Sequence, residues 1–292
     1  MNDISADFEA RKMSRLKWKD VPTRRIDVGG VPFAYRELGP DTGLPVIFLH
    51  HLMAVLDDWE PRVIDGIAAQ HRVIAFDNRG VGASGGSVPD TIEAMGRDAI
   101  AFIRALGHKQ VDLLGFSLGG GVAQMVALQA PDLVRRMVLA GTGPRGGGGI
   151  DEINRITVIA YLKAALTWSD ARNFLFFPRT PEGKRAARDY FAALKEERTK
   201  DRDQPISLQA RRAQLAAIKA AGLSEPDDLS LITQPVLVAN GDHDLMVASS
   251  LSADMACRLP NAKLTIYPDS GHGGVFQHHQ AFVREVLDFL AN

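Results

Sequence analysis

The sequence predicts an α/β protein, with a mostly parallel, doubly wound sheet of about eight strands and an inserted helical segment. Two observations predict this fold class. Short continuous apolar runs, typical of strands that are covered on both faces, recur along the chain. Between the later runs the apolar residues change to a spacing of about 3.6, which is typical of helices. Strands that alternate with helices favour a parallel sheet with helices on both sides.

The expected strands follow one another from residue 24 to residue 267, at 24–28, 31–37, 45–49, 73–76, 111–114, 134–140, 235–239 and 262–267. The first two should form a β-hairpin, because the Gly29-Gly30 pair suits a tight turn that requires positive φ. Helical spacing predicts a helix over 90–106, with Asp90 and Glu93 as its N-cap and third-position partner. The last helix is expected at 277–290.

One region interrupts the alternation of strands and helices. A glycine-rich stretch, 141–149, follows the strand that ends at Ala140 and suits a hinge. After it, helices are expected at 153–167, 171–177, 181–197 and 207–221. A helical excursion between two strands is most simply a cap over the strand ends. We therefore expect an N-terminal extension at 1–22, a core made of 23–145 and 232–292, and a helical cap at 146–231. Whether the extension packs on the body or on a partner subunit stays open.

The composition is that of an ordinary globular protein, with 46% hydrophobic and 24% charged residues. The formal net charge of −1 provides no general field to attract nucleic acid or a membrane surface. The first twenty residues are charged throughout and do not look like a secretory signal, and no later run approaches a membrane span. These features predict a cytoplasmic protein with a small-molecule substrate, no nucleic-acid partner and no membrane partner. Self-association into a homo-oligomer is left open.

A single cysteine, Cys257, is present. An intrachain disulfide is therefore impossible, and a zinc site built on several thiolates is excluded. Its helix-like surroundings predict a buried core thiol.

The segment 111–130 carries the strongest chemical signal. An apolar run leads into Gly115-Phe116-Ser117-Leu118-Gly119 and then into a helical pattern of small residues. The flanking glycines let the end of a strand and the start of a helix approach closely, so that a serine between them is exposed above a sheet in a strained conformation. This arrangement predicts a nucleophilic serine.

A serine hydroxyl needs a base to take its proton, and the base must be held by a third group. Asp242 and Asp244 lie in the loop that follows the strand 235–239, and His272 lies in a glycine-flanked loop after the last strand. A carboxylate just beyond a strand can reach a histidine above the sheet. The chain therefore supplies a serine, an acid and a histidine in that order.

With these motifs, the sequence resembles α/β-hydrolase fold enzymes that carry a helical cap, from about residue 24 to the C-terminus. The matching segments are LHH…DDW (49–59), FDNRGVGAS (76–84), GFSLGGG (115–121), GDHD (241–244) and SGH (270–272). The resemblance implies that Ser117 is the nucleophile and that His272 is the general base and then the acid. It favours Asp244 over Asp242 as the residue that orients the imidazole, because the family's acid usually lies three residues after this glycine.

Two backbone N–H groups are expected to form the oxyanion hole. One is that of Leu118, at the start of the helix after the nucleophile. The resemblance places the other at Leu52, in the loop after the strand 45–49. The family pattern there is His-Gly followed by the donor residue, whereas this chain has His50-His51-Leu52. His51 therefore stands where glycine is usual, and the backbone path of this loop is left open.

A serine at this turn argues against the epoxide hydrolases and haloalkane dehalogenases of the same fold, which use an aspartate there. The resulting hypothesis is a carboxylic-ester or lactone hydrolase (EC 3.1.1) for a small or medium apolar substrate, which would bind in a pocket that includes His51, Trp168, Phe176 and Phe177. No cofactor is expected. No metal is expected either, because adjacent histidines in an extended segment point to opposite faces.

Three other functions stay open. One is a cofactor-free perhydrolase, the activity of the non-haem haloperoxidases that the sequence resembles. A second is hydrolysis of a carbon–carbon bond. The third, of another class, is a ligand-binding receptor that retains the three residues.

Overall fold

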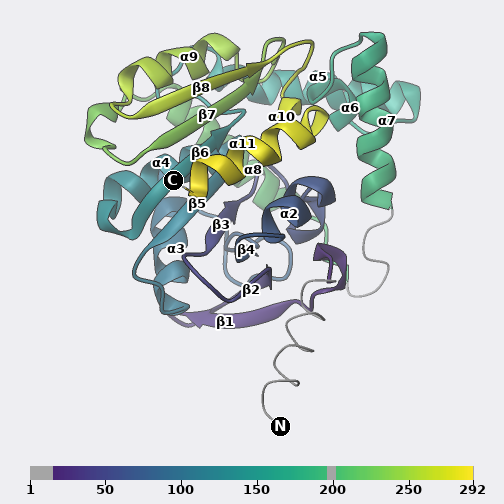
Figure 1. Cartoon of the computed structure of the whole chain (residues 1–292). Helices are drawn as coiled ribbons and strands as arrows, with labels where there is room; N and C mark the ends of the chain where they lie inside the picture. The colour runs from purple at the N-terminus through teal and green to yellow at the C-terminus, as the bar shows by residue number, and fades with distance from the viewer. Residues whose placement is uncertain (1–15, 196–201, 292) are drawn as a thin grey trace.

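The computed structural model describes residues 16–195 and 202–291, which form an eight-stranded sheet with helices on both faces (Figure 1). The strands lie in the order β1-β2-β4-β3-β5-β6-β7-β8. Their bounds are β1 Arg24–Val28, β2 Val31–Leu38, β3 Val46–Leu49, β4 Val73–Phe76, β5 Val111–Phe116, β6 Val134–Ala140, β7 Val236–Gly241 and β8 Ala262–Tyr267. All of the expected strands are present, and the predicted fold class is confirmed.

The sheet is antiparallel at one edge and parallel elsewhere. β1 pairs with β2, and β2 with β4, in antiparallel register. Every pair from β4 through β3, β5, β6 and β7 to β8 is parallel. The predicted hairpin turn joins β1 to β2 with φ of 61° at Gly29 and 84° at Gly30, a conformation that glycine adopts without strain.

The order of the strands determines which helices cover which face. The chain steps from β3 to β4 in one direction and from β4 back past β3 to β5 in the other, so right-handed crossovers place α2 and α3 on opposite faces. The next steps continue in the second direction, which puts α4 and α9 on the side of α3. The last helix, α11, packs against α2 on the first face (Figure 1). The bounds are α2 Pro61–Ala68, α3 Ile92–Ala105, α4 Leu118–Gln129, α9 Ser249–Arg258 and α11 His279–Ala291.

The segment between β6 and β7 is helical, as expected. It contains η4 Ile150–Glu152, α5 Ile153–Thr167, α6 Arg172–Leu175, α7 Pro181–Lys195, α8 Leu208–Gly222 and η5 Leu229–Leu231. The backbone N–H of Gly273 donates to the Phe176 carbonyl at the end of α6 (2.9 Å). The N–H of Met53 donates to Oε1 of Gln214 in α8 (2.8 Å). These inserted helices therefore contact the loops that follow β3 and β8, at the carboxyl ends of the parallel strands.

Several local predictions differ from the structure. The helix predicted at 90–106 begins at Ile92 and is capped by Thr91, whose hydroxyl accepts from the N–H of Ala94 (3.2 Å), and not by Asp90. The helix predicted at 277–290 begins at His279, as α11, and a separate short helix, α10 Gly274–Gln277, precedes it. Cys257 is exposed and not a core thiol, because it lies two positions from the buried Met255 and so on the opposite face of α9.

The described part of the expected N-terminal extension packs on the body of the molecule. Trp18, in the short helix η1 Trp18–Asp20, is fully buried, and its Nε1 donates to the carbonyl of Leu56 (2.9 Å). The rest of the expected extension, residues 1–15, lies outside the described residues, as do the last two residues of the helix predicted at 181–197. The other short helices are η2 Leu56–Asp58 and η3 Pro131–Leu133.

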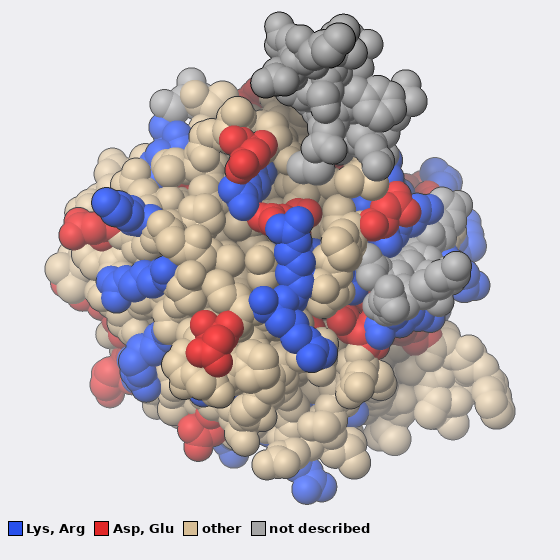
Figure 2. All heavy atoms as spheres, turned by 90° about the horizontal axis from the view of Figure 1, so that it is seen from below, with Lys and Arg blue, Asp and Glu red and all other residues tan. Residues whose placement is uncertain are grey.

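Charged side chains of both signs lie at the surface (Figure 2). On the face shown in Figure 2, basic and acidic side chains are interspersed. Within residues 16–195 and 202–291, no helix combines the length and apolar character that a membrane crossing requires.

Candidate active site

Ser117 occupies the turn between β5 and α4. Its φ of 56° and ψ of −115° lie in a region that residues with a side chain rarely adopt, as the strand-turn-helix motif requires. The surrounding backbone leaves no room for side chains at the two flanking glycines. A Cβ on Gly119 would lie 2.0 Å from the Leu49 carbonyl oxygen, and one on Gly115 would lie 2.3 Å from the Gly119 carbonyl oxygen. The glycines therefore let α4 cross the ends of β3 and β5 closely enough to hold the serine in this conformation.

The structure brings Ser117, His272 and Asp244 into hydrogen-bonding contact. The His272 Nε2 lies 2.9 Å from the Ser117 Oγ, and its Nδ1 lies 2.7 Å from the Asp244 Oδ2. A carboxylate only accepts, so Nδ1 carries the ring proton and Nε2 is free to accept from the serine hydroxyl. The three residues are 8%, 2% and 7% exposed. This arrangement can remove a proton from the serine and stabilise the imidazolium that forms.

Asp244 and Asp242 have different surroundings. The second oxygen of Asp244 accepts from the N–H groups of Met246 (2.7 Å) and Val247 (3.0 Å), which fixes the carboxylate against His272. Asp242 accepts instead from the N–H groups of Asp269 and Ser270, both at 3.1 Å. Asp242 thus joins the loop after β7 to the loop that carries His272.

The expected oxyanion donors lie beside the nucleophile. The backbone N–H groups of Leu118 and Leu52 donate no hydrogen bond to the part of the chain that the structure describes, and both residues line a cavity with Ser117. Leu118 is the first residue of α4, where a helix leaves its N–H groups without an intrahelical partner.

The loop after β3 has its left-handed residue beyond His51. Its left-handed residue is Met53 (φ 66°), two residues beyond the histidine that stands where glycine is usual. The hydrogen bond from the Met53 N–H to Gln214 holds that conformation from the inserted helix α8. His51 therefore needs no glycine-like backbone, because the loop turns further along the chain.

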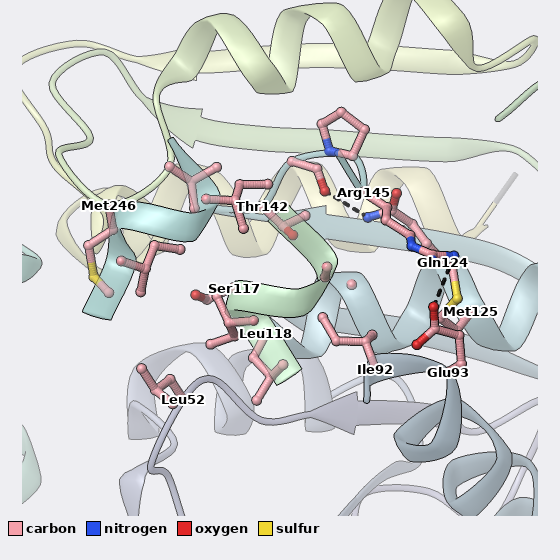
Figure 3. Close-up of a pocket in the computed structure, with 18 residues that line it drawn as sticks. Leu52, Ile92, Glu93, Ser117, Leu118, Gln124, Met125, Thr142, Arg145 and Met246 are labelled. Atoms are coloured by element: carbon pink, nitrogen blue, oxygen red, sulfur yellow. Dashed lines mark hydrogen bonds and ion pairs between the residues drawn. The ribbon is translucent and has the colours of Figure 1, made fainter. Parts of the chain in front are cut away.

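Two cavities meet at Ser117, and both are lined by Leu52 and Met246. The first, the apolar cavity, is narrow, at about 50 Å³. Aliphatic side chains line most of it, and the Arg145–Glu93 ion pair (2.9 Å) lies at the end away from Ser117 (Figure 3). The second, the polar cavity, measures about 480 Å³. Its polar lining consists of Ser117, His272, His51, Asp58, Thr157, Tyr161, Ser169, Asp170 and Arg172.

The four residues predicted to line a substrate pocket have different positions. His51 and Phe176 line the polar cavity, and the Phe176 ring centroid lies 5.7 Å from that of His272. Phe177 is buried against Tyr190, at 5.4 Å between ring centroids, and lines neither cavity. Trp168 is 98% exposed at the end of α5 and also lies outside both cavities. Its φ of 50° lies in the left-handed region of a helix C-cap, so the chain turns there and leaves the indole on the surface.

The adjacent histidines point in different directions, as the sequence predicts. The His50 ring is buried against Trp59, at 5.3 Å between ring centroids, whereas His51 contacts Phe116 and Phe176. Burial lowers the pKa of His50 to about 3, with a smaller contribution from His51. Burial, followed by the charge of Arg172, lowers the pKa of His51 to about 3. Both rings are therefore neutral at pH 7. Among the described residues, no three His, Cys, Asp or Glu side chains are placed to hold a metal ion together.

Sequence reasoning missed three groups at this site. Gln214 supports the loop after β3, and Thr157 lines the polar cavity from α5. Arg172 is held by Asp170 (2.8 Å) and Asp58 (2.9 Å). The apolar spacing of the inserted helices predicted where they form, but no signal in the sequence indicates which of their polar side chains face the serine.

Comparison with known proteins identifies the family to which the chain belongs. The family model described as alpha/beta hydrolase fold matches residues 45–279. The chain therefore belongs to the alpha/beta hydrolase fold family, as its motifs indicate, and is an enzyme of the hydrolase class.

Particular relatives cover most of the chain. The sequence is 29% identical to a non-heme chloroperoxidase of Streptomyces lividans, over 89% of this chain and 96% of that protein. It is 28% identical to a protein of Caulobacter sp. (strain K31) that is named provisionally as the carbamate hydrolase RutD, over 80% of this chain and 85% of the relative. Among solved structures, an alpha/beta hydrolase fold protein from Chitinophaga pinensis has a TM-score of 0.89 and 35% identity, and the match covers 94% of this chain and 99% of that one. The enol-lactonase from Burkholderia xenovorans LB400 shares the fold, with a TM-score of 0.74 at 20% identity over 92% of this chain and all of that one (100%).

Proposed function

We propose that this enzyme is a serine hydrolase that cleaves a small or medium carboxylic ester or lactone through an acyl-enzyme on Ser117 (EC 3.1.1). The observation that carries the proposal is the pair of hydrogen bonds that His272 makes, 2.9 Å to the Ser117 hydroxyl and 2.7 Å to the Asp244 carboxylate. The proposed acyl part is apolar, because the narrower cavity beside Ser117 is lined mostly by aliphatic side chains.

In the proposed mechanism, His272 takes the proton of Ser117 as the hydroxyl attacks the carbonyl carbon. The negative charge that develops on the carbonyl oxygen is stabilised by the N–H groups of Leu118 and Leu52, each of which contributes a few kcal/mol. His272 then gives its proton to the leaving oxygen. Water attacks the acyl-enzyme by the reverse sequence and releases the acid. Segment 146–231 acts as the cap that encloses the substrate. This role is supported by the position of Thr157, Arg172 and Phe176, which line the polar cavity.

Turnover of p-nitrophenyl acetate, p-nitrophenyl butyrate and small lactones tests this proposal. The wild-type enzyme should hydrolyse at least one of these esters, and Ser117→Ala should lower kcat by about 10³-fold or more. Unchanged turnover in Ser117→Ala would overturn the proposal, because the acyl-enzyme requires that hydroxyl.

A second candidate function is perhydrolysis, and it is favoured by the relative named a non-heme chloroperoxidase. In that reaction a carboxylic acid esterifies Ser117 with loss of water, and hydrogen peroxide then attacks the acyl-enzyme and releases a peracid. Assay of peracid formation from acetate and peroxide, beside ester hydrolysis, separates the two activities. Peracid formation that exceeds ester hydrolysis, and that Ser117→Ala removes, would favour the perhydrolase.

A further inference from the structure

The two cavities differ in which catalytic group they contain. Ser117 lines both, but His272 lines only the polar cavity. The leaving oxygen has to lie within hydrogen-bonding reach of the His272 ring, because that ring supplies its proton. The leaving alcohol of an ester therefore belongs in the polar cavity, and the acyl chain belongs in the apolar one. This assignment rests on the proposed function.

His51, which lines the polar cavity, carries a hydrogen-bond acceptor on its ring. Its Nδ1 lies 2.9 Å from the Leu52 carbonyl oxygen, which only accepts, so Nδ1 carries the ring proton. The neutral ring therefore keeps a lone pair on Nε2. That atom is buried and has no hydrogen-bond partner among the described residues. A buried acceptor without a partner is costly, at about 1–3 kcal/mol, and a donor on a bound ligand would remove that cost.

A second residue that lines this cavity carries a polar atom of the same kind. The Thr157 Oγ1, on α5, is buried and has no partner within the described part of the chain. Thr157 and His51 come from segments far apart in the sequence, yet both line this cavity. Two buried polar atoms without partners in one cavity indicate a polar ligand there.

The charged residues of the cavity favour a donor over an anion. Arg172 is held by Asp170 through its Nε (3.0 Å) and Nη2 (2.8 Å), and by Asp58 through its Nη1 (2.9 Å). Arg172 is the only Lys or Arg among the described residues that line this cavity, and it is shared between two carboxylates, whose oxygens are themselves acceptors. A carboxylate or phosphate on the substrate would be repelled, whereas a neutral hydroxyl would find acceptors.

We propose that the enzyme prefers esters whose alcohol part carries a further hydroxyl group, and that His51 Nε2 accepts the hydrogen bond from that hydroxyl. His51 is then a specificity-determining residue, and its side chain selects the leaving group. The usual glycine at this position could not make the contact.

A set of matched butyrate esters tests this proposal. The 2-hydroxyethyl ester has a donor, the 2-methoxyethyl ester replaces it with a group that cannot donate, and the propyl ester has neither. The wild-type enzyme should show at least about tenfold higher kcat/KM for the hydroxyethyl ester than for the methoxyethyl ester, the effect of about one buried hydrogen bond.

The variant His51→Phe keeps an aromatic ring against Phe116 and Phe176 but removes the acceptor. In this variant the ratio of the two kcat/KM values should fall to about one, and His51→Gln, which retains an acceptor oxygen, should restore part of it. A loss of activity that is equal for both esters leaves the ratio of their kcat/KM values unchanged. If His51 only fills space, His51→Phe should therefore keep the wild-type ratio. His108 precedes β5, at the end of that strand away from Ser117; His108→Phe provides the matched control and should keep the wild-type ratio.

The outcomes separate this inference from the proposed function. If the wild-type enzyme hydrolyses these esters without a preference for the hydroxyl, or if His51→Phe keeps the preference, the role of His51 is overturned and the serine mechanism stands. If no ester is hydrolysed, the proposed function itself fails.

Discussion

At the scale of single residues, Asp244 and Asp242 lie two positions apart in one loop but have different partners. Both carboxylates follow β7, but only Asp244 contacts the His272 ring. Asp242 instead accepts from two backbone N–H groups of the neighbouring loop. Their contributions to catalysis should therefore differ in size and in kind.

The variant Asp244→Asn tests this difference. An amide at this position no longer stabilises the imidazolium and favours the wrong tautomer, so kcat for ester hydrolysis should fall by about 10⁴-fold, the scale of the same change in serine proteases. Asp242→Asn should lower kcat by less than about tenfold, because it loosens only the support of the loop. Steady-state kinetics of the two variants, measured side by side, would contradict this assignment if Asp242→Asn were the more damaging change.

Some residues of the site can be predicted from the sequence, and others cannot. Ser117 lies in a motif whose glycines and flanking elements specify the local geometry, and His272 and Asp244 follow strands that end at the same edge of the sheet. Their aromatic type predicts Trp168 and Phe177 in the substrate pocket, yet neither lines the two cavities at Ser117, and Trp168 lines a separate cavity instead. Residue type alone does not determine the direction in which a side chain of an inserted helix points.

At the scale of elements, the crossing of α4 over β3 depends on the absence of a side chain at Gly119. Gly119→Ala would place a Cβ 2.0 Å from the Leu49 carbonyl oxygen, and backbone atoms cannot easily move away. This variant should lose at least about 3 kcal/mol of stability or fail to accumulate as folded protein.

Gly121→Ala is the matched control, because it lies two residues further along the same helix. Its Cβ would meet only the side chain of Ile92, at 3.4 Å, which is ordinary contact. Alanine also favours the helix by up to about 1 kcal/mol over glycine, so this variant should be as stable as the wild type or more stable. Urea unfolding of both variants gives the comparison. Equal stability of the two would show that the close crossing is not required.

The loop after β3 is supported from another element. Gln214 on α8 accepts from the Met53 N–H (2.8 Å), one residue after the proposed donor Leu52. Gln214→Leu should therefore lower kcat by about 10-fold to 100-fold with a smaller change in KM, because a displaced donor acts mainly on the transition state. The exposed Gln209, on the same helix, should tolerate the same change. A fall in kcat of similar size in both variants would contradict the proposed link between α8 and the oxyanion loop.

Element positions were predicted well where strands are buried on both faces, because continuous apolar runs are easily recognised. The N-cap of α3 is predicted one residue too early, because Thr91 and not Asp90 supplies the cap. Asp90 and Thr91 are adjacent, and both residue types make good caps, so local sequence could not separate them.

At the scale of the whole molecule, buried neutral histidines make stability depend on pH. The pKa of His50 is lowered by burial from 6.5 to about 3. Between these values the unfolded chain binds a proton on this ring and the folded chain does not, so unfolding becomes more favourable as the pH falls. The contribution is fully present above about pH 6.5 and is progressively lost as the pH falls toward 3.

The free energy of unfolding at pH 7 and at pH 5 measures this effect. His50→Phe removes the titrating group. Between pH 7 and pH 5 the wild type should therefore lose about 2 kcal/mol more stability than this variant. If wild type and His50→Phe lost the same stability over this step, His50 would not be the neutral buried group described above.

The central claim is that the fold makes Ser117 a nucleophile. The most direct measurement is the reaction of the wild-type protein with a fluorophosphonate, followed by intact mass and peptide mapping. We expect one adduct, on the peptide that contains Ser117, and no adduct in Ser117→Ala. The absence of an adduct from wild-type protein that hydrolyses esters, or an adduct on a different residue, would contradict the claim.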